Sequence, residues 1–249
     1  MLYREERCDI LGIRKQSGPT GAALSLRSPK GMEMFTGFTQ KTSDFIWELS
    51  FNNERPWFNA HKNEYEQLWG TPFKAETLSL MREHCGGRDW SIHISRIYRD
   101  ARRLFGRGPY KDHLWFSIRE GSDGCPPVFW FEMGAAGYAF GMGFYDATSE
   151  MMEAFRKSVD ANPARFAALA EETASFTEFC IDGERYKRPK GTHEGVIAQW
   201  YDLKRPGLEC RRDFGGELFS PELPAILADE YKKLLPMYEY FREIYLMCR

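Results

Sequence analysis

The sequence of 249 residues lacks the short motifs that mark the common nucleotide, metal and hydrolase sites. It contains no GxxxxGK[ST] phosphate loop, no GxGxxG, no HExxH and no GxSxG. Its five histidines show no ligand spacing relative to cysteine or carboxylate residues. We therefore predict no metal site and no bound cofactor, and nothing in the sequence indicates a nucleophilic triad.

Long apolar runs and a strong net charge are also missing. The longest unbroken apolar piece in the middle of the chain is Val128–Phe131, whereas a membrane-spanning helix needs roughly 18 such residues. The formal net charge is −2, which argues against a general nucleic-acid or membrane-surface binder. We expect no membrane contact, and nucleic-acid binding is the least favoured partner hypothesis.

The cysteines are six in number, far apart, and form no CxxC pair. The N-terminal residues Met1–Arg7 have no apolar segment of the kind that directs secretion. We therefore expect reduced cysteines in a cytoplasmic protein.

Residues 1–33 differ from the rest of the chain. Two Gly/Pro/Ser clusters bracket a stretch with few large apolar residues, too few to offset the entropy lost on ordering. We predict a disordered extension over 1–33. Hydrophobic residues make up 43% of the whole chain, and no repeat or composition break follows Phe35, so residues 34–249 are predicted to form one domain.

Helical spacing of apolar residues appears on both sides of the chain's middle. A first helix is predicted to end near Asn52, a second to begin at Pro56, and a third to cover roughly 73–85. Farther along, Asn162 is a plausible N-cap because a proline follows it. The C-terminal helical pattern starts near 221, and Pro236 is expected to interrupt it.

The middle of the chain carries four segments of alternating or continuous apolar residues with short connections: Ile92–Tyr98, Leu114–Ile118, Val128–Met133 and Tyr138–Phe144. Such a series is typical of an antiparallel meander. The segment Trp200–Phe214 allows no assignment. The predicted fold is α+β, with a central, mainly antiparallel sheet of about four or more strands flanked by helices.

Glycines at alternate positions, Gly141 and Gly143, leave one side of the fourth predicted strand nearly bare. This pattern indicates close approach by another backbone or a ligand, or a helix packed on the strand.

The segment 92–111 gathers six cationic residues around one acid, Asp100. In a regular strand Arg96 would share a face with two isoleucines, and a guanidinium there would need a carboxylate or a bound anion. Asp100 and Glu132 are the carboxylates available for an internal network. An anion site is the second interpretation, and a solvated helix face is the third.

An anion site would draw on two segments. The residues that we expect to contribute are Arg55, Lys62, Arg96, Arg99, Asp100, Arg102 and Lys111. His61 lies on an apolar helical stripe, so it is either a hydrogen-bonded core histidine or the proton carrier of a reaction. His93 and His113 could also meet on neighbouring strands.

Several motifs in this order resemble the DUF2461 family. The resemblance covers roughly 35–246, and it implies the domain boundaries and a fold but no activity. The matching pieces are Phe35-Thr36-Gly37-Phe38, Asn52-Asn53-x-Arg55-x-Trp57-Phe58-x-x-His61-Lys62-x-x-Tyr65, Arg96-Ile97-Tyr98-Arg99-Asp100-x-Arg102, Pro109-Tyr110-Lys111, Gly141-x-Gly143, Arg188-Pro189-Lys190-Gly191 and Leu235-Pro236-x-Tyr238.

The loop after Arg102 departs from the family pattern. Members usually have Ser, Lys and Asp residues before Pro-Tyr-Lys, whereas this chain reads Arg103-Leu104-Phe105-Gly106-Arg107-Gly108. Hydroxyl or carboxylate chemistry of that loop would therefore be missing here, although positive charge is retained. Three function hypotheses remain: an anionic small molecule is bound or acted on, the polar residues form the network of a non-catalytic interaction domain, or nucleic acid is contacted.

Overall fold

A six-stranded antiparallel sheet organises the computed structural model, which describes residues 34–249 apart from positions 70, 101, 103, 105, 122 and 123. The strand order is β1-β2-β3-β4-β6-β5. The extension predicted over 1–33 lies outside the described residues. The strands are β1 (Trp90–Ile94), β2 (His113–Glu120), β3 (Val128–Gly134), β4 (Gly137–Gly143), β5 (Cys180–Asp182) and β6 (Gly207–Arg212).

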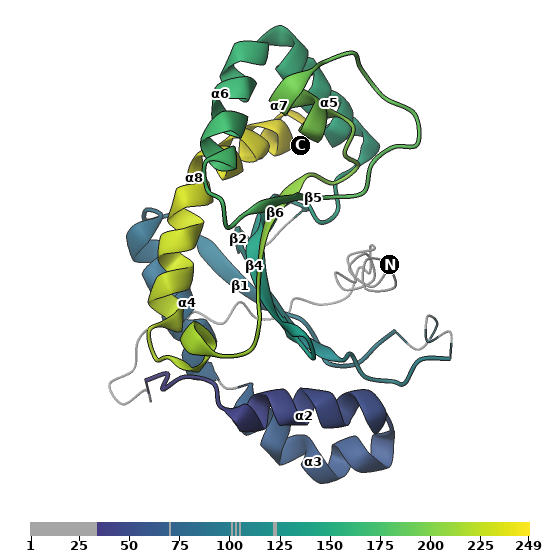
Figure 1. The fold of residues 1–249 in the computed structure, drawn as a ribbon, viewed down its shortest axis with the longest axis vertical. Coiled ribbons are helices and arrows are strands. Elements are labelled where there is room, and N and C mark those ends of the chain that lie inside the picture. Colours follow the sequence, from purple (N-terminus) through teal and green to yellow (C-terminus); the bar gives the residue numbers. More distant parts are fainter. Residues whose placement is uncertain (1–33, 70, 101, 103, 105, 122–123) are drawn as a thin grey trace.

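The helices lie in three groups around this sheet. In Figure 1, α4 and α8 run along one face, α5, α6 and α7 gather around the C-terminal part of α8, and α2 and α3 pair at the opposite end. They are α2 (Gln40–Phe51), α3 (Arg55–Leu68), α4 (Thr71–His84), α5 (Ser149–Ala161), α6 (Pro163–Ala174), α7 (Gly195–Tyr201) and α8 (Leu223–Met247), with a 3-10 turn, η3 (Gly216–Phe219), before α8.

The predicted α+β single domain with an antiparallel meander is confirmed. Strands β1 to β4 pair in sequence order, each antiparallel to the next. Two strands extend the sheet beyond the prediction. Strand β6 comes from the segment that sequence alone left unassigned, and it pairs with both β4 and the short β5.

The helix ends follow the local chemistry of the sequence at α6. The Asn162 side chain accepts a hydrogen bond from the Arg165 backbone N–H at 3.1 Å, and Pro163 occupies the first turn, as predicted. The prediction for Pro236 was wrong, because α8, which is 25 residues long, continues through it without a break. Pro236 lies on the exposed side, while one stripe of α8 is buried along its length. Packing of that stripe outweighs the missing backbone N–H.

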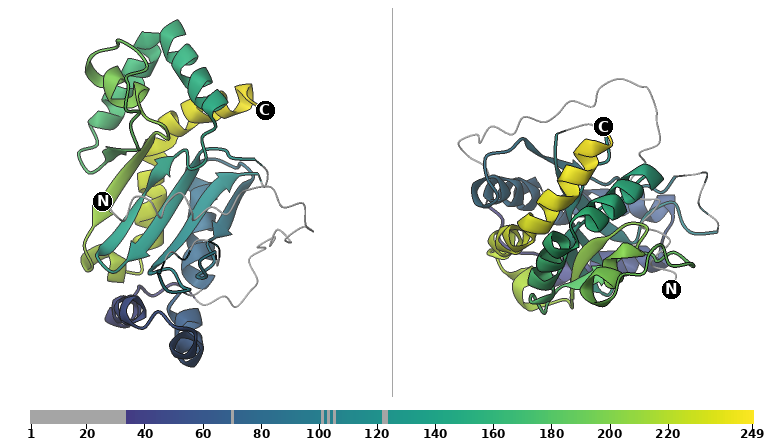
Figure 2. Two further views of the ribbon diagram at one scale, coloured as in Figure 1. Left: turned by 90° about the vertical axis from the view of Figure 1, so that its right-hand side faces the viewer. Right: turned by 90° about the horizontal axis from the view of Figure 1, so that it is seen from above.

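The sheet face under α4 and α8 is the main core. Phe129 stacks on Tyr238 of α8 at 4.7 Å between ring centroids, and the buried Tyr231 hydroxyl donates to the Trp130 carbonyl at 2.8 Å. The opposite face, which we call the second face, is turned toward the viewer in Figure 2 (left), and within the described part of the chain no helix crosses it. A smaller apolar cluster lies there, made of Trp115, Val128, Trp130 and Ala139 with Tyr145 against them.

The glycines of β4 allow a neighbouring strand to come close. A Cβ on Gly141 would lie 1.9 Å from the Leu208 carbonyl oxygen of β6, and one on Gly143 would lie 2.6 Å from the Gly207 Cα. Of the alternatives for this pattern, the close neighbour is therefore the backbone of a strand.

Two further findings bear on the chain's chemistry. The five cysteines within the described residues, 85, 125, 180, 210 and 248, are all free thiols. In the same part of the chain, no helix has the length and apolar character needed to cross a membrane.

Candidate functional site

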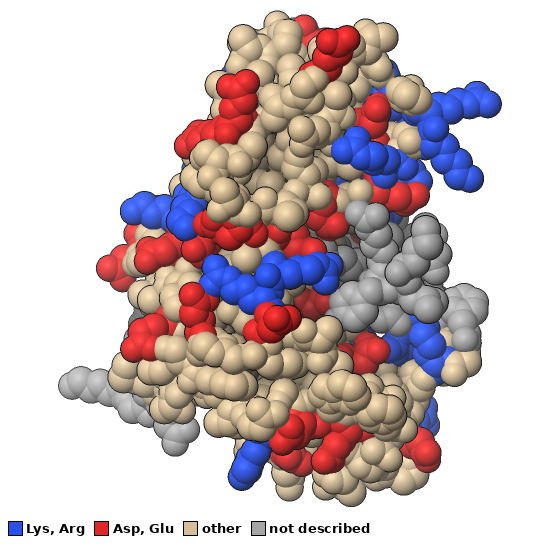
Figure 3. Space-filling view, viewed as in Figure 1, with Lys and Arg blue, Asp and Glu red and all other residues tan. Residues whose placement is uncertain are grey.

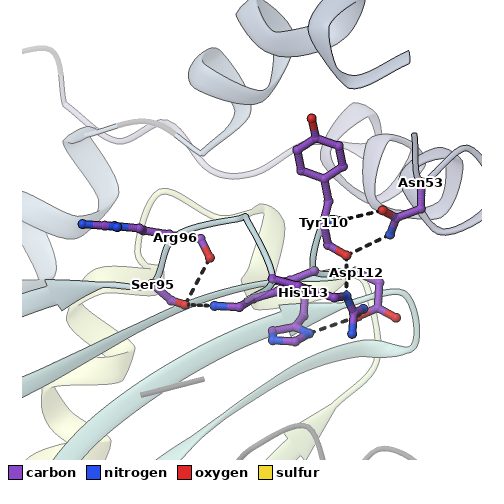
Figure 4. Close-up of polar contacts among 8 residues, drawn as sticks. Asn53, Ser95, Arg96, Tyr110, Asp112 and His113 are labelled. Carbon is purple, nitrogen blue, oxygen red and sulfur yellow. Dashed lines mark hydrogen bonds and ion pairs between the residues drawn. The ribbon is translucent and has the colours of Figure 1, made fainter. Parts of the chain in front are cut away.

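The corner between α2 and α3 is tied to the segment before β2. The Asn53 side chain donates to the Tyr110 carbonyl at 2.9 Å and accepts from the Tyr110 N–H at 2.8 Å (Figure 4). The Tyr110 ring stacks on Phe58 at 4.1 Å. Gly108 is needed beside this contact, since a Cβ there would lie 2.2 Å from Asn53 Oδ1. Two motifs far apart in sequence therefore share one junction.

Arg99 belongs to the same junction. Its Nε donates to the Tyr110 carbonyl at 2.6 Å and its Nη2 to Asp112 Oδ1 at 3.1 Å. The same carboxylate oxygen lies 3.2 Å from His113 Nδ1. The bond from His113, and to a smaller extent the charge of Arg99, lower the pKa of Asp112. The Arg99 side chain is only 10% exposed, so this contact has the character of the internal network.

Arg96 does not occupy the position that strand alternation predicted. Strand β1 ends at Ile94, two residues earlier, and Arg96 follows it with an exposed side chain. Its guanidinium points away from Tyr110 and His113 (Figure 4). The expectation that Arg96 lies beside the isoleucines at the edge of the core was therefore wrong. A solvated cation at the end of a strand needs no internal carboxylate.

Lys111 is the buried cation of the segment. The residue is 9% exposed, and its ammonium donates to Ser95 Oγ at 2.6 Å. Burial, and then the charge of Arg99, lower the pKa of Lys111 to about 8, while Glu132 acts in the opposite direction. Among the described residues no carboxylate forms an ion pair with it. Within the described part of the chain, the hydrogen-bond partner of this ammonium is thus a neutral hydroxyl and not a carboxylate.

One row of side chains runs across the second face and includes the partner of Lys111. The Ser95 N–H donates to the Trp115 carbonyl at 3.0 Å, Trp115 pairs with Glu132, and Glu132 pairs with Ala139. Directly paired residues of an antiparallel sheet point to the same side. Ser95, with Lys111 bonded to it, and Glu132 therefore flank the Trp115 ring.

Glu132 is a buried carboxylate without a hydrogen-bond donor. The residue is 4% exposed, and its Oε2 has no partner among the described residues. It lines a groove of about 340 Å³ at the β3–β4 end of the sheet. The other charged groups on the groove are Arg211, Arg212 and Asp213, which are exposed or half-buried. Arg211 pairs with Glu209 and Arg212 with Glu217.

His93 marks a cationic region at the β1 edge of the same face. Partial desolvation of its imidazole, and then the charges of Arg119, Lys111 and Arg96, lower the pKa of His93. Its ring lies edge-on to Trp115 at 6.5 Å. His93 pairs with Ser117 and not with His113, so the predicted meeting of the two histidines is not found; they are two same-face positions apart.

The remaining predicted site residues lie outside this group. Arg102 chelates the Asp100 carboxylate, with 2.6 Å between Nη2 and Oδ2, and its side chain is 80% exposed. Arg55 is exposed at the first position of α3. Lys62 pairs with Glu66 one turn farther along α3 at 3.6 Å.

His61 has a local role on α3. Its Nδ1 is 2.8 Å from the Trp57 carbonyl, to which it donates, and its ring stacks on Trp57 at 4.1 Å. Of the two interpretations given for His61, these contacts match the hydrogen-bonded histidine, although the residue is half-buried and not in the core. No hydrogen bond or ion pair joins it to segment 92–111 in the described part of the chain.

Sequence reasoning named Lys111 but missed its surroundings. Ser95 and Trp115 carried a signal, because they alternate with the apolar residues of the first two predicted strands and so point to the opposite face. No group of three potential metal ligands occurs among the described residues. Acidic and basic side chains are interspersed over the surface shown in Figure 3.

Comparison with known proteins gives one match. The family model described as "Conserved hypothetical protein (DUF2461)" matches residues 41–240. No curated protein and no solved structure matches the chain. The matched range contains both halves of the Asn53–Tyr110 junction and every strand of the sheet. The chain therefore belongs to the DUF2461 family.

Proposed function

We propose that this protein binds a small anionic molecule on the second face of its sheet, with Lys111 as the principal cation. The carrying observation is that the Lys111 ammonium is buried and is held by the Ser95 hydroxyl, with no carboxylate paired to it among the described residues. A buried cation is costly unless an opposite charge offsets it, and a bound phosphate or carboxylate group would supply that charge.

The neighbouring groups support an anion rather than a cation at this place. Arg96 and Arg119 are close enough to His93 to lower the pKa of that histidine together with Lys111. Trp115 and the Ser117 hydroxyl lie on the same face. Both are buried, and a few polar groups gathered beside an aromatic ring and a lysine of lowered pKa are typical of a small-molecule site.

Arg99 and Arg102 have a different role in this proposal. Arg99 is held by Tyr110 and Asp112, and Arg102 is held by Asp100. These contacts favour the structural network for both arginines. We therefore assign Arg99 and Arg102 a role in holding the conformation of the segment and not in binding the ligand.

Thermal unfolding with added anions tests the proposal, and a second buried lysine provides the control. Lys111→Met keeps the length of the side chain and removes its charge. Lys74→Met does the same on α4, where Lys74 is also buried and donates to the Trp69 carbonyl. Inorganic phosphate and short alkyl carboxylates, compared with chloride at equal ionic strength, should raise the melting temperature of the wild type and of Lys74→Met.

Lys111→Met should lose that increment, and the wild-type increment should decrease as the pH rises above about 8, where Lys111 becomes neutral. The same rise in melting temperature in wild type and Lys111→Met would refute the proposal. So would the absence of any increment in the wild type with every anion tested.

A further inference from the structure

Glu132 is a second buried charged group on the second face, and like Lys111 it needs a partner of opposite charge. Its carboxylate is buried, and Oε2 receives no hydrogen bond from any described residue. A buried carboxylate oxygen without a donor is as unfavourable as a buried cation without an acceptor. An anion alone would not satisfy it and would repel it, so the ligand of the proposed function needs another group here.

The two requirements lie at a fixed separation. Ser95, which holds the Lys111 ammonium, and Glu132 stand on either side of Trp115 in one cross-strand row. With adjacent strands about 4.8 Å apart, the Cα atoms of Ser95 and Glu132 are roughly 10 Å apart. Glu132 raises the pKa of Lys111, yet the two side chains form no ion pair within the described part of the chain. The two groups therefore carry opposite charges and attract each other, but they do not form a salt bridge.

The groove beside Glu132 has room for a ligand group and suits a cationic one. Its volume is about 340 Å³. Both arginines on it already have acidic partners, Glu209 for Arg211 and Glu217 for Arg212. The remaining charged groups on its lining, Glu132 and Asp213, are both acidic. The local balance therefore favours a group that donates hydrogen bonds and carries positive charge.

We infer that the ligand is bipolar: an acidic group lies at Lys111, and a protonated amine or guanidine on the same molecule donates to Glu132. This inference rests on the proposed function and specifies the class of ligand, an amino acid-like or amino-phosphate-like zwitterion. The amine would give Glu132 Oε2 the donor that it lacks, and the acid would give Lys111 its counter-charge.

Binding constants for three matched sets of probes test the inference: ω-amino carboxylates of three to six carbons, alkyl carboxylates of the same lengths, and the corresponding alkylamines. One amino carboxylate should bind the wild type about tenfold to a hundredfold tighter than its alkyl carboxylate, the range expected for a hydrogen bond between charged groups. Glu132→Gln keeps the side-chain shape and should abolish this preference; because it also removes the repulsion between Glu132 and an anion, it should not weaken the binding of the alkyl carboxylates. Glu153→Gln, on the exposed surface of α5, should retain it.

Failure of the inference can be told apart from failure of the proposed function. Equal binding of amino and alkyl carboxylates to the wild type would overturn the inference alone, and this comparison needs no variant to fold. A preference that survives in Glu132→Gln would overturn it as well. If no carboxylate binds but alkylamines bind in a Glu132-dependent way, the Lys111 anion site is wrong and the Glu132 site stands.

Discussion

Lys74 and Lys111 are the two buried lysines among the residues that the structure describes, and each donates a hydrogen bond to a neutral oxygen. Lys74 donates to the Trp69 carbonyl and lies 4.8 Å from the Trp69 ring centroid. Lys111 donates to Ser95 Oγ. Burial lowers the pKa of both to about 8. Only Lys111 faces a second charged group across a ring of the second face, which is why only it is assigned to the ligand.

The pH dependence of stability should report these two lysines. A lysine with a folded-state pKa near 8 and an unfolded value near 10.5 binds fewer protons when folded, so its destabilising contribution is full below pH 8 and disappears toward pH 10.5. We expect the free energy of unfolding of Lys74→Met, minus that of wild type, to fall by as much as about 1.4 kcal/mol per pH unit across this window.

The measurement is urea denaturation at closely spaced pH values. The difference between variant and wild type isolates the lysine from tyrosines and cysteines that titrate in the same range. Lys157→Met, which removes an exposed lysine of α5, should give a difference independent of pH. A flat difference for Lys74→Met would show that Lys74 is hydrated in the folded protein.

Between elements, the Asn53–Tyr110 junction joins α2 and α3 to the segment before β2, which contains Lys111. Gly108→Ala should cost about 1–3 kcal/mol in free energy of unfolding, because its Cβ would collide with the Asn53 amide. In an Asn53→Ala background the same change should cost less, since the two nearest colliding atoms, Oδ1 and Cγ, are gone and only the Cβ contact at 2.5 Å remains. A double-mutant cycle measured by denaturant unfolding gives this coupling.

The control for that cycle is Gly87→Ala, where an added Cβ meets nothing within 4 Å. It should change the free energy of unfolding by less than about 0.5 kcal/mol in either background. If the effects of Gly108→Ala and Asn53→Ala on the free energy of unfolding are strictly additive, the junction accommodates the added methyl group without strain against Asn53.

A second prediction at the scale of single elements concerns Pro236 within α8. Pro236→Ala should raise the free energy of unfolding by about 1–2 kcal/mol, because it restores a backbone N–H on the exposed side of a helix that is otherwise continuous. Pro163→Ala in the first turn of α6 should instead lower it by a few tenths of a kcal/mol. Thermal unfolding of both variants, in parallel with the wild type, checks the opposite signs.

How far the sequence predicted these elements depended on whether the deciding interaction was local. Asn162 and Pro163 were placed correctly because a cap is a property of adjacent residues. Pro236 was misjudged because the packing of a buried stripe along a 25-residue helix outweighs the local cost of one proline. Strand β6 was missed since its partners β4 and β5 are distant in sequence. The same limit applies to Lys111 and Glu132, because only the pairing of strands places them on either side of the Trp115 ring.

On the scale of the whole molecule, α8 connects regions that would otherwise be separate. Its N-terminal part, as far as Tyr238, packs on the sheet, where Tyr231 and Tyr238 meet Phe129. Its second half enters the group formed by α5, α6 and α7, where Phe241 is fully buried. One helix therefore belongs to both parts of the core, and we predict that they unfold together.

Phe241→Ala tests this cooperativity. The ring stacks on Phe144 at 4.9 Å and lies about 6 Å from those of Phe155 and Trp200, so its removal should cost about 3–5 kcal/mol. Because α8 is continuous, hydrogen exchange should accelerate equally in the slowest amides of β3 and of α6, although only the latter is near the cavity. Phe241→Leu, with a smaller cost, provides the same comparison if the alanine variant does not fold. Faster exchange confined to α5, α6 and α7 would instead divide residues 34–249 into two units, and the second face with Lys111 would then be independent of the helical end.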